Sequence, residues 1–253
     1  MNYSIFILSH QDDEFGIFEV VRKAILRKEK VIIFYMTNGM INKSIPKFKL
    51  FYRDEESLLV LKKIGVQENN IIFFGRLNNI PTCCLYKKMS YAYLKLIKYF
   101  KKYNGKIKIY THAWEGGNED HDACYVLVKK ILRKVKKIKV AYQFPLYNAN
   151  TNLFYYSVQK ILKINGKPIK IKTNLLCRLQ YIKYLFYYKS QVRVWIGLYP
   201  FLIFNFLIRD YCILQKINEK KSIKKPHQGT LLYEKLRNSK YKDLKKNFLY
   251  FLK

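Results

Sequence analysis

The stretch Ser4-Ile5-Phe6-Ile7-Leu8-Ser9-His10-Gln11-Asp12-Asp13 joins an apolar run to a cluster of polar side chains. A short, continuous apolar run is typical of a strand that is covered on both faces. His10 and Asp13 stand three residues apart directly after this run, so both side chains can meet on one metal ion. Asp12 is then left free to act on whatever the metal holds. The ordinary alternative is a capping arrangement, because Asp favours helix N-termini.

A second polar segment, residues 115–122, carries His121 among acidic neighbours and follows the apolar run at residues 107–110. Taken alone, such a segment is most often a solvated turn. In an open parallel sheet, however, the carboxyl ends of the strands share one crevice, so we expect the two segments to converge. Two histidines and one aspartate leave a fourth zinc position open for water. The pair of segments therefore favours a metal-dependent hydrolase.

Short apolar runs alternate with helical patterns over residues 4–142. This alternation predicts an α/β, Rossmann-like fold with a mostly parallel sheet of about five or more strands flanked by helices. We expect a catalytic α/β domain over residues 1–150. A helical, aromatic-rich extension over residues 151–253 should pack on it, with two long apolar helices over residues 180–214. The expected strands are residues 4–8, 31–35, 71–74, 107–110 and 139–142, and the expected helices are residues 14–27, 53–64, 88–103 and 122–136.

Basic residues dominate the composition. Lys and Arg number 49 against 17 Asp and Glu, which gives a formal net charge of +32. Such a charge attracts an anionic membrane surface, an anionic glycan or nucleic acid. A competing explanation is codon drift in an AT-rich genome. The basic residues are spread along the chain and accompany no nucleic-acid-binding motif, so specific nucleic-acid binding is not expected.

The longest apolar run, residues 194–208, is shorter than the ~20 residues of a membrane-spanning helix and contains Pro200. We expect a buried helix, a dimer interface or a contact with a membrane surface. No signal-peptide pattern precedes the first strand, and the five cysteines leave an odd thiol, which suits a reducing compartment. The expected location is the cytoplasm, peripheral to the inner membrane surface if the apolar run contacts lipid.

Four motifs over residues 1–125 resemble those of the PIG-L/LmbE-like zinc-dependent N-deacetylase family, in the family's order. Ser9-His10-Gln11-Asp12-Asp13-Glu14 resembles its His-Pro-Asp-Asp-Glu motif, and Gly116-Gly117-Asn118-Glu119-Asp120-His121 resembles Gly-Gly-His-Pro-Asp-His. Thr37-Asn38-Gly39 resembles Thr-Asp-Gly. Arg53-x-x-Glu56 with the following Ile64-Gly65-Val66 resembles the Arg-x-x-Glu helix and its Leu-Gly-Val ending. The resemblance implies the same fold and the hydrolysis of an N-acetyl group.

The resemblance also implies roles for individual residues. It assigns His10, Asp13 and His121 as ligands of Zn²⁺ and Asp12 as the general base. Asp120 is implied as a catalytic residue that orients a metal ligand through a hydrogen bond, as carboxylates often do beside metal-bound histidines.

Asn118 stands where the family usually has a histidine that stabilises the oxyanion. An amide can donate a hydrogen bond there but cannot shuttle a proton. Three outcomes remain open: Asp12 carries both proton transfers, a nearby histidine substitutes, or the activity is weak. His112 and His227 are the candidate substitutes, and for each of them a structural role is the more ordinary expectation.

The substrate implied by the resemblance is an N-acetylglucosamine-type amino sugar on a glycan, lipid or nucleotide-sugar precursor. Arg53 and Thr37 are expected at the pocket, where a guanidinium holds a hydroxyl or phosphate. Tyr147 and Gln191 are expected to contact the sugar. The rival role for Arg53 is an i,i+3 pair with Glu56 on the helix surface. The alternative function is a catalytically weak or inactive relative that binds an anionic glycan or membrane surface.

Overall fold

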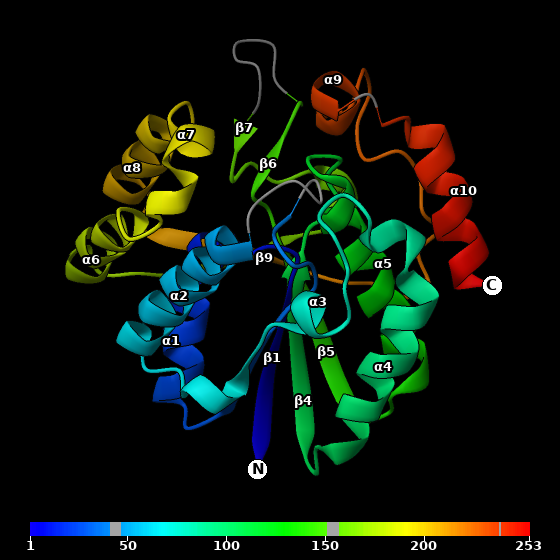
Figure 1. The fold of residues 1–253 in the computed structure, drawn as a ribbon, viewed down its shortest axis with the longest axis horizontal. Helices are drawn as coiled ribbons and strands as arrows, with labels where there is room; N and C mark the ends of the chain where they lie inside the picture. The colour runs from blue at the N-terminus through cyan, green and yellow to red at the C-terminus, as the bar shows by residue number, and fades with distance from the viewer. Residues whose placement is uncertain (41–46, 151–156, 238) are drawn as a thin grey trace.

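A computed structural model describes residues 1–40, 47–150, 157–237 and 239–253 (Figure 1). A seven-stranded sheet in the order β3-β2-β1-β4-β5-β9-β8 forms its centre. The strands from β3 to β5 are parallel, whereas β9 is antiparallel to both β5 and β8. This confirms the predicted mostly parallel α/β sheet. The strands are β1 Asn2–Leu8, β2 Lys30–Tyr35, β3 Ile71–Ile72, β4 Lys106–His112, β5 Ile138–Phe144, β8 Pro168–Lys172 and β9 Tyr211–Lys216, with β6 Tyr147–Asn148 and β7 Ser157–Val158 paired in a separate hairpin.

Helices cover both faces of the sheet. Figure 1 shows α1, α2 and the group α6 to α8 on one side, and α4, α5 and α10 on the other. The helices are α1 Phe18–Leu26, α2 Lys47–Ile64, α3 Phe74–Leu77, α4 Met89–Lys102, α5 Glu119–Lys134, α6 Leu175–Leu185, α7 Val192–Trp195, α8 Tyr199–Ile208, α9 Leu232–Arg237 and α10 Tyr241–Leu252.

The central strand β1 shows why its apolar run forms a buried strand. Ile5, Phe6, Ile7 and Leu8 are all fully buried. Alternate residues join two different cores: Ile5 and Ile7 pack with residues of α4 and α5, and Phe6 and Leu8 pack with residues of α1, α6 and α8. Burying each such side chain stabilises the fold by roughly 1.5–3 kcal/mol. The end of β1 is therefore held firmly in the middle of the sheet.

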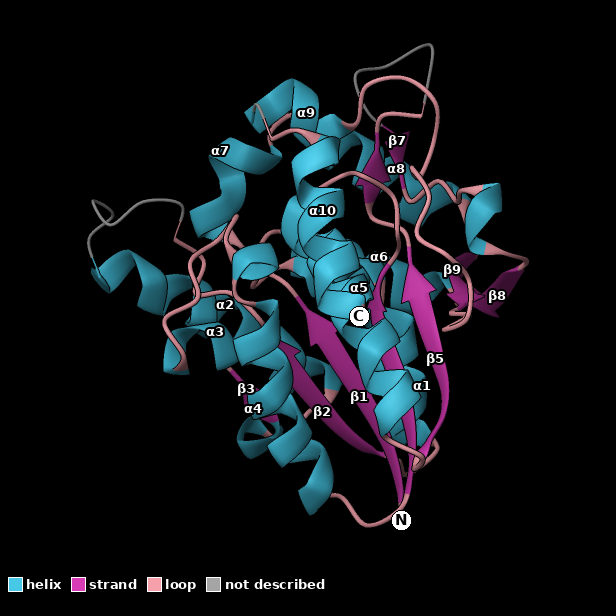
Figure 2. Cartoon of the chain, turned by 90° about the vertical axis from the view of Figure 1, so that its right-hand side faces the viewer, coloured by secondary structure: helices cyan, strands magenta, loops and turns pink. Residues whose placement is uncertain are grey.

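The direction of the connections reverses between β1 and β4. The chain leaves β1 for β2 and β3 on one side, and then returns to β4 on the other side. Such a switch point opens a crevice at the carboxyl ends of the strands. Figure 2 shows the parallel strands pointing towards the end of the molecule that carries α7, α9 and the β6–β7 hairpin. The loops after β1 and β4 both begin at this crevice.

Two sequence-based elements were predicted wrongly. The strand predicted over residues 71–74 ends at Ile72, and α3 begins at Phe74. The chain turns here because α3 approaches the end of β2 closely: a Cβ atom on Gly75 would lie 2.2 Å from the backbone of Thr37. Residues 180–214, predicted as two long helices, contain the end of α6, then α7, α8 and the strand β9.

The C-terminal part is consequently not purely helical. It adds β8 and β9 to the sheet, and β9 pairs with β5 through Gln143 and Gln215. A short apolar run fits a helix and a strand equally well, so only the pairing decides its conformation. The division into a catalytic domain and an extension at residue 150 stays a prediction.

The apolar run at residues 194–208 is divided between the end of α7 and α8, a helix of 10 residues with Pro200 in its first turn. Within the described ranges, no helix combines the length and the apolar character needed to cross a bilayer.

Candidate metal centre and active site

The loop after β1 turns back on itself around Asp13. The Oδ2 atom of Asp13 accepts hydrogen bonds from the backbone N–H of His10 at 2.6 Å and from the Ser9 hydroxyl at 2.9 Å. These bonds satisfy the buried carboxylate and bring the His10 ring next to it. Asp12 lies at φ 126°, a region that costs a residue with a side chain about 1–3 kcal/mol and recurs at functional sites. The contacts around Asp13 hold this conformation.

The second polar segment supplies His121 from the first turn of α5. Asn118 caps this helix, because its Oδ1 accepts the backbone N–H of Asp120 at 2.8 Å. The donor atoms of His10, Asp13 and His121 all lie within 4.8 Å of one another, and all three residues are buried. The two segments therefore converge at the switch point as expected, and they bring two imidazoles and one carboxylate together.

These three residues fit a divalent metal ion. Among the described residues, neither of the two buried ring nitrogens of His121 has a hydrogen-bond partner, although Nε2 lies 3.3 Å from Oδ1 of Asp13. Burial lowers the pKa of His121 to about 3, which keeps the ring neutral as a metal ligand must be. Burial alone would raise the pKa of Asp13, but the neighbouring imidazoles hold it well below its usual range. A set of two nitrogens and one oxygen is common at zinc sites with an open position.

Asp120 lies behind His10 rather than in the three-residue group. Its Oδ2 is 3.2 Å from Nε2 of His10 and also accepts the backbone N–H of Cys83, while Oδ1 accepts the N–H of Leu85. A hydrogen bond from Nε2 to this carboxylate would turn Nδ1 of His10 towards Asp13. Carboxylates orient metal-binding histidines in this way.

Asp12 and Arg53 form an ion pair at the edge of the group. The Arg53 guanidinium is 3.2 Å from Oδ1 of Asp12 and donates to the carbonyls of Gln11 and Gly39. The rival pairing with Glu56 does not form, because Glu56 instead accepts hydrogen bonds from the backbone and hydroxyl of Ser190. Burial raises the pKa of Asp12 to about 7, although the charge of Arg53 opposes this shift.

A cavity of about 230 Å³ opens in front of these residues. Its polar side includes Asp12, Arg53, Asn118, Tyr147 and Gln191, which the sequence analysis named. Its lining residues are His10, Asp12, Asp13, Phe15, Arg53, Thr82, Gly117, Asn118, Tyr147, Gln191, Trp195, Leu198, Leu232, Leu236 and Arg237.

Thr37 does not line this cavity. It is fully buried beneath the loop, and its hydroxyl donates to the carbonyl of Ser9 at 2.8 Å. The reason is the close approach of α3, which covers Thr37 through Gly75. In the structure Thr37 supports the loop after β1, so the expectation of a direct substrate contact is corrected.

Apart from Gln191, the cavity residues that come from the C-terminal part were not expected from the sequence. Trp195 is the last residue of α7, and Leu198 lies in the turn after it. Leu232, Leu236 and Arg237 belong to α9. Arg237 is fixed by an ion pair with Glu119 at 3.0 Å. None of these residues belongs to a local motif. Glu119 belongs to the second motif, but its partner Arg237 is far along the chain, so only the tertiary structure reveals this ion pair.

The two additional histidines lie in different places. His112 is fully buried at the end of β4, where Nε2 accepts the backbone N–H of Ser9 at 2.9 Å. Its ring stacks on His121 with centroids 3.9 Å apart. His227 contacts the carbonyl of Gln228 and does not line the cavity. The ordinary structural role expected for both rings agrees with these positions.

Glu115 is a buried carboxyl group away from the three-residue group. It accepts hydrogen bonds from the backbone N–H groups of Leu146 and Tyr147 and from the Asn148 amide. Burial nevertheless raises the pKa of Glu115 from 4.5 to about 8. Between about pH 4.5 and about pH 8, the carboxyl group of Glu115 therefore keeps its proton in the folded protein, whereas the unfolded chain has released it. The stability contributed by this proton is lost as the pH rises towards 8.

We expect Glu115→Gln to remove this pH dependence. Between about pH 5 and about pH 8, the unfolding free energy of the wild type should fall by at least about 1 kcal/mol more than that of the variant, because one pKa unit corresponds to about 1.4 kcal/mol. Urea unfolding of both proteins across this range measures the difference in slope. Parallel profiles would show that Glu115 is already ionised in the folded protein.

The fold and the donor group define an α/β protein with a candidate metal centre at its switch point. The chain matches the family model PIG-L, described as GlcNAc-PI de-N-acetylase, over residues 5–132, which is just over half of its length. The chain belongs to this family. A search of curated proteins gave no match.

Several solved structures share the fold. N,N'-diacetylchitobiose deacetylase from Pyrococcus horikoshii has a TM-score of 0.60 and 16% identity, covering 86% of this chain and 84% of that chain. The A40926 pseudoaglycone deacetylase has a TM-score of 0.62 and 14% identity, with 87% and 99% covered. The 4-carboxy-2-hydroxymuconate hydratase from Pseudomonas putida KT2440 has a TM-score of 0.52 and 11% identity, with 88% and 99% covered. At such identities the similarity shows the fold alone, and a fold does not determine a reaction.

Proposed function

We propose that this protein is a zinc-dependent hydrolase that removes the N-acetyl group from an N-acetylglucosamine-type amino sugar. The observation that carries the proposal is the buried group of His10, Asp13 and His121 beside the carboxylate of Asp12, in a cavity. Membership of the PIG-L family supports the same reaction, as do the deacetylases among the proteins with this fold.

The three residues of the group would hold the metal, and Zn²⁺ suits their nitrogen and oxygen atoms. When bound, the ion would supply Lewis-acid polarisation of the acetamide carbonyl and a water molecule that is acidic near pH 7. Asp120 would keep the His10 ring in the orientation needed for binding.

Asp12 would carry the proton transfers. Its carboxylate would take the proton of the attacking water and then give a proton to the departing amine. The Arg53 guanidinium, at 3.2 Å, would hold the carboxylate in place. Asn118 uses Oδ1 to cap α5 and also makes a side-chain hydrogen bond with Tyr147, which leaves one amide N–H to donate to the developing oxyanion. No proton shuttle at position 118 is needed in this scheme.

The walls of the cavity suit an amino sugar. Tyr147 and Trp195 offer aromatic surfaces on which a pyranose face can stack, while Gln191 and Arg53 offer hydrogen-bond donors for hydroxyl or phosphate groups. Leu198, Leu232 and Leu236 add an apolar side for the carrier of the sugar. The proposed carriers are therefore a glycan, a lipid or a nucleotide-sugar precursor.

The proposal is tested by release of acetate, together with the appearance of a free amine, from a panel of N-acetylglucosamine conjugates. The zinc-loaded protein should release both products in equal amounts from at least one conjugate. Binding of a conjugate without release of either product would support the alternative function, a catalytically inactive relative that binds a glycan. Asn118 is the observation that favours this alternative.

Asn118→His tests whether the amide at this position limits the rate of the proposed hydrolase. If Asp12 is a working base and the amide only stabilises charge, an imidazole at this position should raise the rate of acetate release by about tenfold or more, because a positioned general acid contributes roughly 10²–10⁴-fold. Loss of the helix cap costs only about 1 kcal/mol. The rates of both proteins on one conjugate measure the effect. An unchanged rate would indicate that Asp12 already performs both transfers at full efficiency.

A further inference from the structure

Helix α8 presents an apolar face to solvent. Phe204, Leu207 and Ile208 are 62%, 48% and 65% exposed, and Ile196 in the preceding turn is 71% exposed. Leu207 and Ile208 follow Phe204 by three and four residues, so these three side chains lie on one side of α8. No charged residue occurs between positions 194 and 208. A large apolar surface of this kind usually marks an interaction site.

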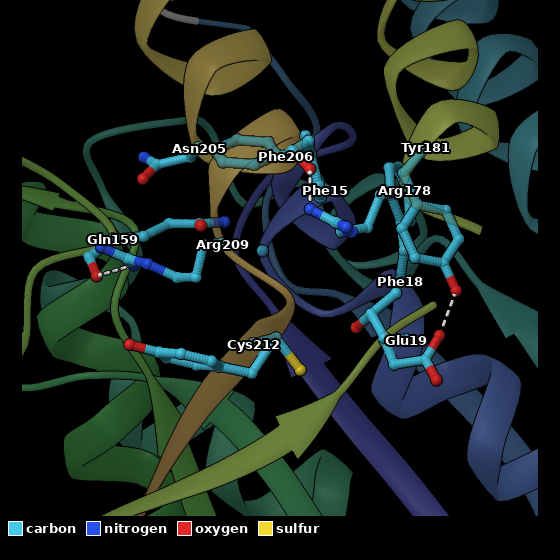
Figure 3. A pocket seen from close by; sticks show the side chains of 13 residues that line it. Phe15, Phe18, Glu19, Gln159, Arg178, Tyr181, Asn205, Phe206, Arg209 and Cys212 are labelled. Atoms are coloured by element: carbon cyan, nitrogen blue, oxygen red, sulfur yellow. Dashed lines mark hydrogen bonds between the residues drawn. The ribbon is translucent and has the colours of Figure 1, made fainter. Parts of the chain in front are cut away.

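The inner side of α8 is held firmly against the protein. Leu202 is fully buried, and the ring of Phe206 packs against that of Tyr181, with their centroids 6.0 Å apart. Arg178 of α6 donates to the carbonyl of Phe206 (Figure 3) and also to that of Leu207, which satisfies the last turn of α8. The cavity beneath the helix holds only about 20 Å³, room for about one water molecule. The exposed face is therefore a fixed surface of the fold.

The segment of the chain that carries this face is basic in sequence. Over residues 170–216 the single acidic residue is Asp210, and Arg193 and Arg209 flank the uncharged run at its two ends. The basic residues of this segment are Lys170, Lys172, Arg178, Lys183, Lys189, Arg193, Arg209 and Lys216. An apolar helix face bordered by cationic side chains is complementary to a bilayer that contains anionic lipid.

A second copy of the chain is a poorer occupant of this surface. Each copy carries a formal charge of +32, so a symmetric contact would bring two sets of flanking cations together. An anionic lipid surface supplies the opposite charge for the cations and an apolar layer for the aromatic and aliphatic side chains.

We propose that α8 docks this protein on an anionic lipid bilayer. The side chains of Phe204 and Ile208 enter the boundary between the headgroups and the acyl chains, and the flanking lysines and arginines contact lipid phosphates. The same segment also supplies Trp195 and Leu198 to one wall of the candidate-site cavity. Docking would therefore hold this wall of the cavity close to the membrane surface.

The test is flotation with phosphatidylcholine vesicles, prepared with and without phosphatidylglycerol. The Phe204→Asp/Ile208→Asp variant changes the proposed face. The matched control is Leu94→Asp/Tyr250→Asp, which places the same charges at sites 64% and 78% exposed on α4 and α10. These helices lie on the other side of the sheet (Figure 1). The wild type and the control should bind the phosphatidylglycerol vesicles, and the α8 variant should bind at least about tenfold more weakly.

Three results would overturn the proposal: no binding by the wild type, equal weakening in both variants, or a wild-type dimer in solution that the α8 substitutions dissociate. The last result would assign the face to a second copy. If the α8 variant fails to fold, quenching by brominated lipid decides the question in single tryptophan substitutions. Because the chain already contains Trp114 and Trp195, quenching is compared with that of the wild type. Phe204→Trp should show additional quenching by brominated phosphatidylglycerol vesicles and Tyr250→Trp should show none, and equal additional quenching would contradict docking through α8.

Discussion

Replacing Asp12 with asparagine is expected to reduce acetate release by about 10²-fold or more while the protein keeps its metal. General acid–base catalysis by one positioned side chain contributes roughly 10²–10⁴-fold. Asparagine has nearly the same shape and can still accept a hydrogen bond from Arg53, which now lies 3.2 Å from Oδ1. It cannot take a proton from water. The loss should therefore appear in kcat, with KM changed little.

The matched control for this variant is Asp243→Asn, which removes a carboxylate from the exposed surface of α10. It should retain the wild-type rate. Metal content is measured on the same samples, so that a loss of activity can be separated from a loss of the ion. An Asp12→Asn protein that retains more than about a tenth of the wild-type rate would exclude Asp12 as the general base.

Replacing His121 with alanine is expected to remove the metal. The imidazole supplies one of three donor atoms, and its nitrogens have no hydrogen-bond partner in the described part of the chain. Two remaining ligands leave the ion largely in water. Mass spectrometry of the native protein should find close to one zinc per chain in the wild type and little in the variant, and acetate release should be lost with the ion.

His227→Ala is the matched control, because this histidine lies outside the cavity and contacts the carbonyl of Gln228. It should bind zinc like the wild type. Equal zinc content in all three proteins would place the metal elsewhere. If none of the three proteins binds zinc after reconstitution, the metal site is contradicted, and the alternative function, an inactive relative that binds a glycan, is favoured.

Much of the fold could be predicted because its signals are local. The continuous apolar runs of β1 and β2 can only be satisfied between two layers of helices, and the structure buries them there. The meeting of the two polar segments was also predictable. It depends on one topological rule, that parallel strands end at a shared edge, together with the three-residue spacing of His10 and Asp13. The chemical roles of these residues stay predictions.

The errors have a common cause. The strand β9 was taken for helix because its short apolar run, which ends before Gln215 and Lys216, has no decisive period, and its pairing with β5 decided the outcome. Arg53 had two local options, Glu56 on its own helix or a partner elsewhere. The loop after β1 supplied the partner, Asp12, and Glu56 was used by Ser190.

The sequence by itself determined the parallel sheet, the two motif loops and the group of His10, Asp13 and His121, since each follows from spacing within a few residues and from strand direction. Only the tertiary structure decided which surfaces face the group. Trp195, Leu232 and Arg237 reach the cavity from α7 and α9, and Thr37 is covered by α3. Such contacts depend on which distant segments pack together, and that choice leaves no local signal in the chain.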